Sequence, residues 1–475
     1  MTLGLISIMA SVVGSPIVGQ DDFGRFLTKV TATRQDSTSQ LRVFQIGDSH
    51  LQAGFFGGRM RDRFQKVFGS AGRGLAFPHR TAGSNGAFDL RWGTPDSWSA
   101  SNAIRREPGF VWGLAGWSIR SEDSVGTLNF RLAATEGVID SFAQVTILGQ
   151  FNGIEISDST QAWVKRDSSS VSFTAARSQR TDRFQLKVHG EKSRIDGIVL
   201  QSARPGILWN DAGVNGMSWS DLLKPSLLWK QLQSLGPDLV VLSLGTNDAW
   251  YPKYDESAFR TTAKEVLHRI RLVAPSSSIL LTLPPDHALK AGRRKTAPNP
   301  RLTSVIKILR ELCEGGAATC VDLQEMMGGE GSWKEWTANG LMAKDHVHYA
   351  KAGYIKHADL VADALLALPA TETSTDVSSG IARKQEIDPQ ETIRFLVSQD
   401  SLIAATTWAE PKKVEPVETV AKVVEKKSAS KSKTVKKSSD KSKAVKKGKS
   451  TKDRKVAKKK APVKKKIVKR TGKKR

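Results

Sequence analysis

Residues 43–56 read VFQIGDSHLQAGFF, an apolar run that is interrupted by Gly-Asp-Ser-His at 47–50 and then resumes. The run before the interruption is typical of a buried strand, and apolar residues at helical spacing over 54–68 predict a helix after it. Gly, Asp and Ser are common in turns and helix caps, so the interruption is explained by a strand-to-helix turn. It is equally explained by a serine nucleophile at the edge of a sheet. The stretch alone leaves both interpretations open.

The same alternation of strand and helix resumes after residue 206. Further strands are predicted at 206–211, 238–244, 278–283 and 320–323, and helices at 220–232, 257–273, 301–312 and 352–368. The run 238–244 is almost wholly apolar, as strands of buried parallel sheets are. The pattern therefore predicts an α/β fold in which helices flank a parallel sheet.

Residues 88–205 break that rhythm. Short strand-like runs occur at 127–134, 141–149, 153–158, 170–176, 183–190 and 196–202, with Gly, Asp and Ser between them. This spacing predicts an all-β sandwich inserted into the α/β domain. The region holds five of the twelve tryptophans, at positions 92, 98, 112, 117 and 163. Such aromatic side chains either fill a core or stack on sugar rings, and both interpretations remain open.

The formal charge of +26 is concentrated at the C-terminus. Residues 411–475 carry 28 Lys and Arg against five acidic residues, a net charge of +23 that leaves +3 for the first 410 residues. This Lys-rich, low-complexity segment is predicted to be disordered, and 371–410 to be a linker with a short helix near 390–404. The tail would bind anionic polymers in a salt-dependent way, or have no dedicated partner.

The N-terminus and the cysteines bear on the compartment. Residues 1–20 have the apolar core of an export signal, so we expect a periplasmic, cell-envelope or secreted protein. They lack the basic start of such a signal, so a cytoplasmic location is the alternative. No apolar run reaches 18 residues, so no transmembrane helix is predicted. Cys313 and Cys320 are too few for a zinc site and form either one disulfide or two packed thiols.

Four polar blocks lie in loops of the α/β part, three of them directly after predicted strands. They are Gly-Asp-Ser-His at 47–50, Gly-Val-Asn-Gly at 213–216, Gly-Thr-Asn-Asp at 245–248 and Asp-His-Val-His at 345–348. Catalytic groups of open α/β sheets gather at the carboxyl ends of the strands. Serine-dependent ester hydrolysis needs a nucleophile, a base, a group that orients the base, and donors for the oxyanion. The four blocks supply all of these residue types.

In this order, the blocks resemble the SGNH (GDSL-like) hydrolase superfamily. The resemblance implies that Ser49 is the nucleophile, His348 the general base and Asp345 the carboxylate that orients it. It also implies an oxyanion hole made by the Ser49 N–H, the Gly216 N–H and the Asn247 side chain. Neither a metal nor an organic cofactor is implied.

Neighbouring polar residues are assigned supporting roles. We expect Asp48 to shape the turn, and Thr246 and Asp248 to stabilise their loop. His346 is expected at the rim of the site, and His50 departs from the leucine of the commoner GDSL form. The remaining histidines have no motif support and are interpreted as surface or packing residues: His79, His189, His268, His287 and His357.

The segment GDSHLQAGFFGGRMRDRFQKVFGSAGRGLAFP is similar to the start of the SGNH peptidoglycan O-acetylesterase and O-acetyltransferase group, including the turn at 68–74. That group carries a carbohydrate-binding-module-like β-sandwich between the first and second blocks. The resemblance, over roughly residues 40–368, implies a flavodoxin-like three-layer domain split into 21–87 and 206–370, with the insert at 88–205.

The function implied is removal or transfer of O-acetyl groups on cell-wall carbohydrate, most simply peptidoglycan, through an acetyl-serine intermediate. Two alternatives remain open: an SGNH esterase acting on another acetylated polysaccharide or a small ester, and a non-catalytic protein that binds carbohydrate or polyanions. The partner of the basic tail would be an anionic polymer or membrane surface, or nucleic acid in the cytoplasm. The sequence leaves the oligomeric state open.

Overall fold

The computed structural model describes residues 16–33, 39–105, 110–134, 140–158, 162–166, 170–290, 296–370 and 387–408. The chain divides into a unit of Met1–Glu410 and a unit of Pro411–Arg475, and every described residue belongs to the first. The predicted basic tail therefore lies outside the described residues. So do residues 1–15 of the predicted export segment and 371–386 of the predicted linker.

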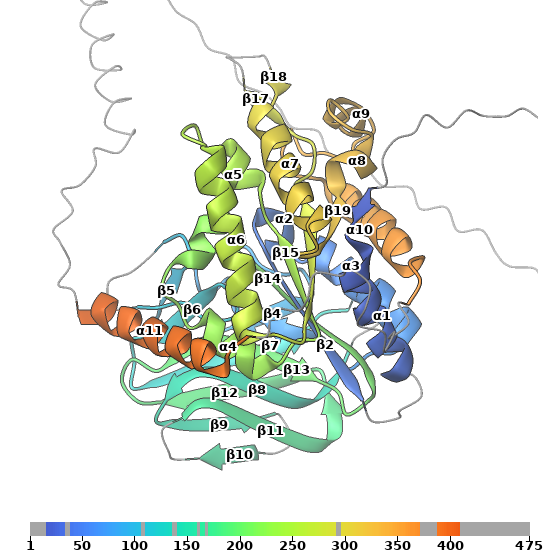
Figure 1. The fold of residues 1–475 in the computed structure, drawn as a ribbon. Helices are drawn as coiled ribbons and strands as arrows, with labels where there is room; N and C mark the ends of the chain where they lie inside the picture. The colour runs from blue at the N-terminus through green and yellow to red at the C-terminus, as the bar shows by residue number, and fades with distance from the viewer. Residues whose placement is uncertain are drawn as a thin grey trace, which may run out of the picture. The chain divides into compact units, whose positions relative to one another are not determined.

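A six-stranded sheet with the order β1-β19-β16-β15-β2-β14 runs through the first unit (Figure 1). Its strands are β1 (Ile17–Val18), β2 (Gln40–Gly47), β14 (Gly206–Gly213), β15 (Leu239–Ser243), β16 (Ser278–Leu283) and β19 (Thr319–Asp322). Neighbouring strands are parallel except for the β1–β19 pair. The parallel α/β fold predicted from the sequence is confirmed.

Each strand contributes side chains to two apolar cores, because successive residues of a strand point to opposite faces. Val43 and Trp209 belong to one core and Phe44 and Leu208 to the other. The main helices on the first core are α1 (Gln20–Thr33), α3 (Phe55–Phe68) and α10 (Lys351–Leu366), joined by shorter helices. The main helices on the second core are α4 (Leu228–Leu235), α6 (Glu256–Val273) and α7 (Pro300–Glu314), also joined by shorter ones. The sheet thus lies between two helical layers.

The single helix predicted at 220–232 is wrong. A short 3-10 helix, η1 (Trp219–Leu223), ends at Lys224, whose backbone is extended with φ −69° and ψ 149°. Pro225 follows, and a proline disfavours the helical conformation in the residue before it and has no N–H to donate. A new helix, α4, begins only at Leu228.

The inserted region forms two antiparallel sheets, as predicted, with the orders β10-β9-β12-β7-β4 and β11-β8-β13-β6-β5. Their strands are β4 (Leu90–Gly93), β5 (Trp98–Asn102), β6 (Trp117–Ser121), β7 (Val125–Leu132), β8 (Phe142–Phe151), β9 (Gly153–Ser157), β10 (Ala162–Arg166), β11 (Ser170–Thr181), β12 (Arg183–His189) and β13 (Arg194–Gln201). Strands β4, β5, β6 and β10 were not predicted from the sequence.

The five tryptophans of the inserted region are buried or half-buried. Trp112 and Trp117 belong to the apolar core, and Trp92, Trp98 and Trp163 pack against it. This packing favours the core interpretation of these side chains over a sugar-binding platform.

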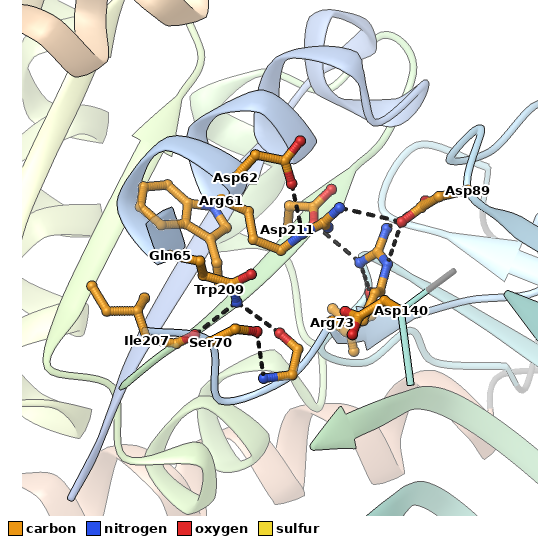
Figure 2. Close-up of polar contacts among 12 residues, drawn as sticks. Arg61, Asp62, Gln65, Ser70, Arg73, Asp89, Asp140, Ile207, Trp209 and Asp211 are labelled. Atoms are coloured by element: carbon orange, nitrogen blue, oxygen red, sulfur yellow. Dashed lines mark hydrogen bonds and ion pairs between the residues drawn. The ribbon is translucent and has the colours of Figure 1, made fainter. Parts of the chain in front are cut away.

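A buried cluster of two arginines and two aspartates connects the insert to the sheet (Figure 2). Arg73 donates to both carboxylate oxygens of Asp89, at 2.9 and 3.0 Å, and to Oδ1 of Asp211 at 3.2 Å. Arg61 lies 3.3 Å from Asp89 and 3.7 Å from Asp211. Burial alone would raise the pKa of Asp89, but the two guanidinium charges outweigh it and hold that pKa well below its ordinary value. Strand β3 (Gly74–Ala76), which follows Arg73, pairs with β13 of the insert.

Two terminal segments also pack on the sheet domain. Strand β1 lies within the predicted export segment and pairs with β19. The short helix predicted near 390–404 is confirmed as α11 (Pro389–Trp408), which lies within the predicted linker. The Phe395 ring lies 6.0 Å from that of Trp229 on α4, and the Thr392 hydroxyl donates to the Leu272 carbonyl on α6 at 2.9 Å. Among the described helices, none is long and apolar enough to cross a membrane.

Short elements follow the carboxyl ends of the parallel strands. They are α2 (Ser49–Gln52), α5 (Thr246–Trp250), the hairpin of β17 (Ala288–Lys290) and β18 (Thr296–Pro298), α8 (Leu323–Met327) and α9 (Trp333–Ala338). The predicted site residues lie in these elements and in the loops beside them.

Candidate active site

Three of the four polar blocks meet because three neighbouring strands end at the same level. The last residues of β14, β2 and β15 are in register: Gly213 pairs with Gly47, and Gly47 pairs with Ser243. The blocks at 47–50, 213–216 and 245–248 therefore emerge side by side. The fourth block lies in the loop between α9 and α10.

Ser49, His348 and Asp345 form a continuous hydrogen-bonded chain. The Ser49 Oγ lies 2.7 Å from Nε2 of His348, and Nδ1 of His348 lies 2.8 Å from Oδ2 of Asp345. A carboxylate only accepts hydrogen bonds, so the imidazole proton lies on Nδ1 and the Nε2 lone pair faces the serine. The arrangement is that of a nucleophile, a base and a group that orients the base.

Asp345 is fixed by its own loop. Its Oδ1 accepts hydrogen bonds from the backbone N–H groups of Val347 and His348, each at 3.0 Å. Partial burial by itself raises the pKa of Asp345, but the hydrogen bonds from the His348 ring and from these two N–H groups outweigh it and hold the pKa below its ordinary value. The side chains of His348 and Asp345 are 39% and 45% exposed, so water reaches both.

The expected oxyanion donors lie in the three blocks that follow β2, β14 and β15. Asn247 donates through Nδ2 to the Met217 carbonyl at 2.9 Å, and the same nitrogen lies 3.4 Å from Oδ2 of Asp48. Within the described part of the chain, the N–H groups of Ser49 and Gly216 donate no hydrogen bond. Gly216 has a φ of +86° with open space around it, a conformation that favours glycine. These N–H groups are thus available to a ligand oxygen.

Gln52, which was not predicted as a site residue from the sequence, links the serine helix to the second block. Its Oε1 accepts from the Asn215 N–H at 2.6 Å, and its Nε2 donates to the Asn85 carbonyl at 2.6 Å. The Asn215 side chain in turn donates to Oδ1 of Asn85 at 2.8 Å. A Cβ on Gly213 would lie 2.2 Å from the Gln52 backbone nitrogen, so only glycine permits this approach. The only signal in the sequence was a glutamine within the largely apolar run LQAGFF at 51–56, because its burial is visible only in the structure.

Asp48 caps α2, as expected from its place before the serine. Its carboxylate accepts from the His50 N–H at 2.9 Å and is buried. Burial raises the pKa of Asp48 to about 7, against the hydrogen bond from His50 and the nearby His348. The residue beside the nucleophile therefore changes charge near neutral pH.

His50 packs against the ring of the expected base. The ring centroids of His50 and His348 lie 5.3 Å apart, and the Tyr354 hydroxyl lies 3.4 Å from His50 Nδ1. Burial, together with the neighbouring histidines, holds the pKa of His50 well below its ordinary value, so the ring is neutral at neutral pH. A neutral ring packs against His348 without opposing its protonation.

The other polar neighbours contact residues other than Ser49. His346, with a φ of +59°, lies 3.2 Å from the Thr337 hydroxyl through Nδ1 and packs against the Trp333 ring. Asp248 accepts from the Trp219 N–H at 3.2 Å and stabilises its loop, and burial raises its pKa to about 7. Among the remaining histidines, His79, His287 and His357 are buried.

The described residues offer few candidates for a metal site or a reactive thiol. No group of three or more His, Cys, Asp or Glu side chains there is arranged to hold a metal ion. Cys313 and Cys320 are both buried free thiols. A hydrogen bond with Cys320, together with burial, raises the pKa of Cys313, so this thiol is not an activated nucleophile.

Residues 196–355 match the model of the GDSL-like lipase/acylhydrolase family. The chain contains a GDSL-like lipase/acylhydrolase domain. Domains of this kind are serine ester hydrolases. The matched segment includes Gly216, Asn247, Asp345 and His348, whereas Ser49 precedes the inserted sandwich. The parallel pairing of β2 with β14 and β15 places Ser49 beside the loops of the matched segment that hold Gly216 and Asn247.

Several solved structures are similar to this chain, and the first of them shares its fold. One described as a peptidoglycan O-acetylesterase in action has a TM-score of 0.61 and 23% identity, and the alignment covers 74% of this chain and 98% of that one. A lipase/acylhydrolase from Enterococcus faecalis has a TM-score of 0.26 and 22% identity, with 34% and 75% covered. A family two carbohydrate esterase from Clostridium thermocellum has a TM-score of 0.26 and 12% identity, with 54% and 97% covered. A comparison with curated proteins gave no match.

Proposed function

We propose that this protein is an acetyl esterase that removes O-acetyl groups from cell-wall carbohydrate, with peptidoglycan as its substrate. The observation that carries the proposal is the chain of contacts from Ser49 Oγ to His348 Nε2 at 2.7 Å and from His348 Nδ1 to Asp345 Oδ2 at 2.8 Å. The acylhydrolase family match supports the ester chemistry. The choice of substrate is supported by the fold shared with a peptidoglycan O-acetylesterase.

The first half-reaction forms an acetyl-serine. His348 Nε2 accepts the Ser49 hydroxyl proton as Oγ attacks the ester carbonyl, and the carboxylate of Asp345 stabilises the imidazolium that results. The tetrahedral oxyanion accepts hydrogen bonds from the Ser49 and Gly216 N–H groups and from Asn247. Collapse breaks the bond to the sugar oxygen, which leaves with the proton held by His348.

The second half-reaction regenerates the serine. Water gives a proton to His348 Nε2 while its oxygen attacks the acetyl carbonyl, and the same donors hold the second oxyanion. Collapse releases acetate and returns the proton to Ser49. If a sugar hydroxyl takes the place of water, the same steps transfer the acetyl group, so transfer is a second product of one mechanism.

Asn247 must release one contact to serve as a donor. Its Nδ2 carries two hydrogens; one is held by the Met217 carbonyl at 2.9 Å, and the other faces Asp48 Oδ2 across 3.4 Å. A hydrogen bond of that length is weak. A developing oxyanion therefore competes well for the second hydrogen, while the first keeps the amide in place.

We also propose that the protein works in the cell envelope or outside the cell, where its substrate lies. The Lys-rich segment 411–475 would then bind anionic wall polymer or a membrane surface through its charge of +23. Cell fractionation that finds the protein in the cytoplasm of the native organism would contradict this location.

The test is acetate release by the Ser49→Ala variant beside a surface control, Ser220→Ala. We expect wild type and the control to release acetate from O-acetylated peptidoglycan faster than from acetylated xylan, and Ser49→Ala to lose both activities. A preference for xylan would move the substrate to another polysaccharide. Unchanged turnover by Ser49→Ala, or no labelling of wild type by a serine-directed phosphonate, would refute the esterase.

A further inference from the structure

Two aromatic side chains next to the oxyanion donor are exposed. Trp250 is 40% exposed and Tyr251 is 58% exposed, whereas the other strongly exposed large apolar side chains of the described residues are aliphatic. A single exposed apolar residue needs no explanation, but two exposed aromatic residues that follow one another in the chain beside a reaction centre do. The five tryptophans of the inserted sandwich, by contrast, are buried or half-buried in its core.

The helical spacing of α5 places Trp250 close to the reacting centre. This helix spans Thr246–Trp250 and contains Asn247, whose side-chain nitrogen lies 3.4 Å from Asp48, the residue before the nucleophile. Side chains three positions apart on a helix are neighbours, with Cβ atoms about 5–6 Å apart. The indole of Trp250 therefore extends from the side of the site where the oxyanion forms.

Two side chains fix the backbone just before these rings by hydrogen bonds. The Ala249 carbonyl accepts from Asn299 Nδ2 at 3.0 Å and from Arg301 Nε at 2.8 Å. The Trp250 ring packs over buried His287, with centroids 6.1 Å apart and planes 35° apart, and His287 is itself bonded to Asn299 at 3.0 Å. One face of the indole is thus supported, and the side chain is pre-ordered before any ligand arrives.

We propose that Trp250 and Tyr251 form a stacking platform for pyranose rings of the glycan chain that carries the ester. The inference rests on the proposed function and deepens it, because a platform beside the reacting centre selects a polymer over a small acetyl ester. The apolar C–H face of a pyranose matches an aromatic ring, and the rings bring large contact area at low entropic cost. Sugar recognition is thereby assigned to the acylhydrolase domain itself.

The test compares two substrates in the full-length protein. We expect the double variant Trp250→Ala/Tyr251→Ala to lose about 10–100-fold in kcat/KM on O-acetylated peptidoglycan, the size of one or two stacked-ring contacts. Its loss on 4-nitrophenyl acetate should be at least about tenfold smaller, because that ester does not reach the platform. The single variant Trp250→Phe, which keeps an aromatic ring at this position, should retain most of the wild-type kcat/KM on O-acetylated peptidoglycan. Val67→Ala, which removes a side chain of the same 40% exposure on α3, is the matched control and should change neither rate.

A binding measurement keeps the platform separate from the proposed reaction. De-O-acetylated peptidoglycan is sedimented with wild type and the double variant at high ionic strength, which screens the basic tail. We expect the bound fraction of the variant to fall even if wild type releases no acetate, an outcome that would refute the proposed substrate and spare the platform. Equal binding, or equal losses on the two substrates, would overturn the platform.

Discussion

Replacing Asp345 by asparagine tests whether this carboxylate sets the tautomer of His348. The asparagine Oδ1 must accept the backbone N–H groups of Val347 and His348, as Oδ1 of Asp345 does at 3.0 Å. Its NH2 group then faces Nδ1 of His348, where the native carboxylate oxygen lies at 2.8 Å. Two donors cannot face each other, so the imidazole proton moves to Nε2, and His348 can no longer accept the proton of Ser49.

The size of the effect follows from the hydrogen bonds involved. Turning the amide over to restore the productive tautomer would set its NH2 against two backbone donors and give up two bonds worth about 1 kcal/mol each. The charge-assisted bond to the imidazolium, worth about 1.5–3 kcal/mol, is lost as well. Asp345 is 45% exposed, so solvent screening keeps the sum near its lower end. We expect a barrier about 3–4 kcal/mol higher, or a roughly 10²–10³-fold lower kcat.

Asp345→Ala is the informative comparison, because it removes the carboxylate without adding a donor. The site is open to solvent, so a water molecule can accept the Nδ1 proton and preserve the tautomer. We expect a loss of about 10–100-fold, which makes the alanine variant the more active of the two. The assay is kcat on 4-nitrophenyl acetate, with thermal unfolding to exclude misfolding. An asparagine variant as active as the alanine variant or wild type would refute the tautomer argument.

Three further predictions concern Asn247, the proposed oxyanion donor, and the buried charges. Asn247→Ala should lower kcat by about 10²–10³-fold with little change in KM; a change in KM alone would rule out a role in the transition state. Asp48→Asn keeps the cap of α2 and removes a carboxyl whose pKa of about 7 in the folded state lies above its unfolded value of 3.8. In the wild type, the cost of ionising this group in the folded state lowers the free energy of unfolding as pH rises from about 4 to 7. Urea unfolding should therefore show the variant gaining up to about 4 kcal/mol over wild type across that range, with no further gain above about pH 7. A pH-independent difference would contradict the burial argument. Arg73→Met leaves Asp89 buried without its main counter-charge and should cost about 3–5 kcal/mol at neutral pH. The pKa of Asp89 is depressed, so this cost should shrink as acid protonates the carboxyl; a cost that is constant with pH would refute the charge pairing.

Much of the fold was predictable from the sequence because its signals are local. Strand runs such as 238–244 and 278–283 are predominantly apolar, and the flanking helices show apolar residues at helical spacing; both patterns are complete within a few residues. The helix predicted at 220–232 was wrong although the signal, Pro225, was present in the sequence. The short strands β4, β5, β6 and β10 gave weaker signals, because their pairing and not their composition defines them.

The identities of the candidate site residues were determined by the sequence, since glycine, serine, asparagine and an Asp-x-x-His pair stand at recognisable places in the chain. Their meeting was decided by the tertiary structure: Ser49 and His348 are 299 positions apart, and only the register of β14, β2 and β15 and the path of the chain into α10 bring them within 2.7 Å. The same holds for the link from Gln52 to Asn215 and for the raised pKa of Asp48. Those properties depend on burial and on long-range neighbours, which a linear pattern does not contain.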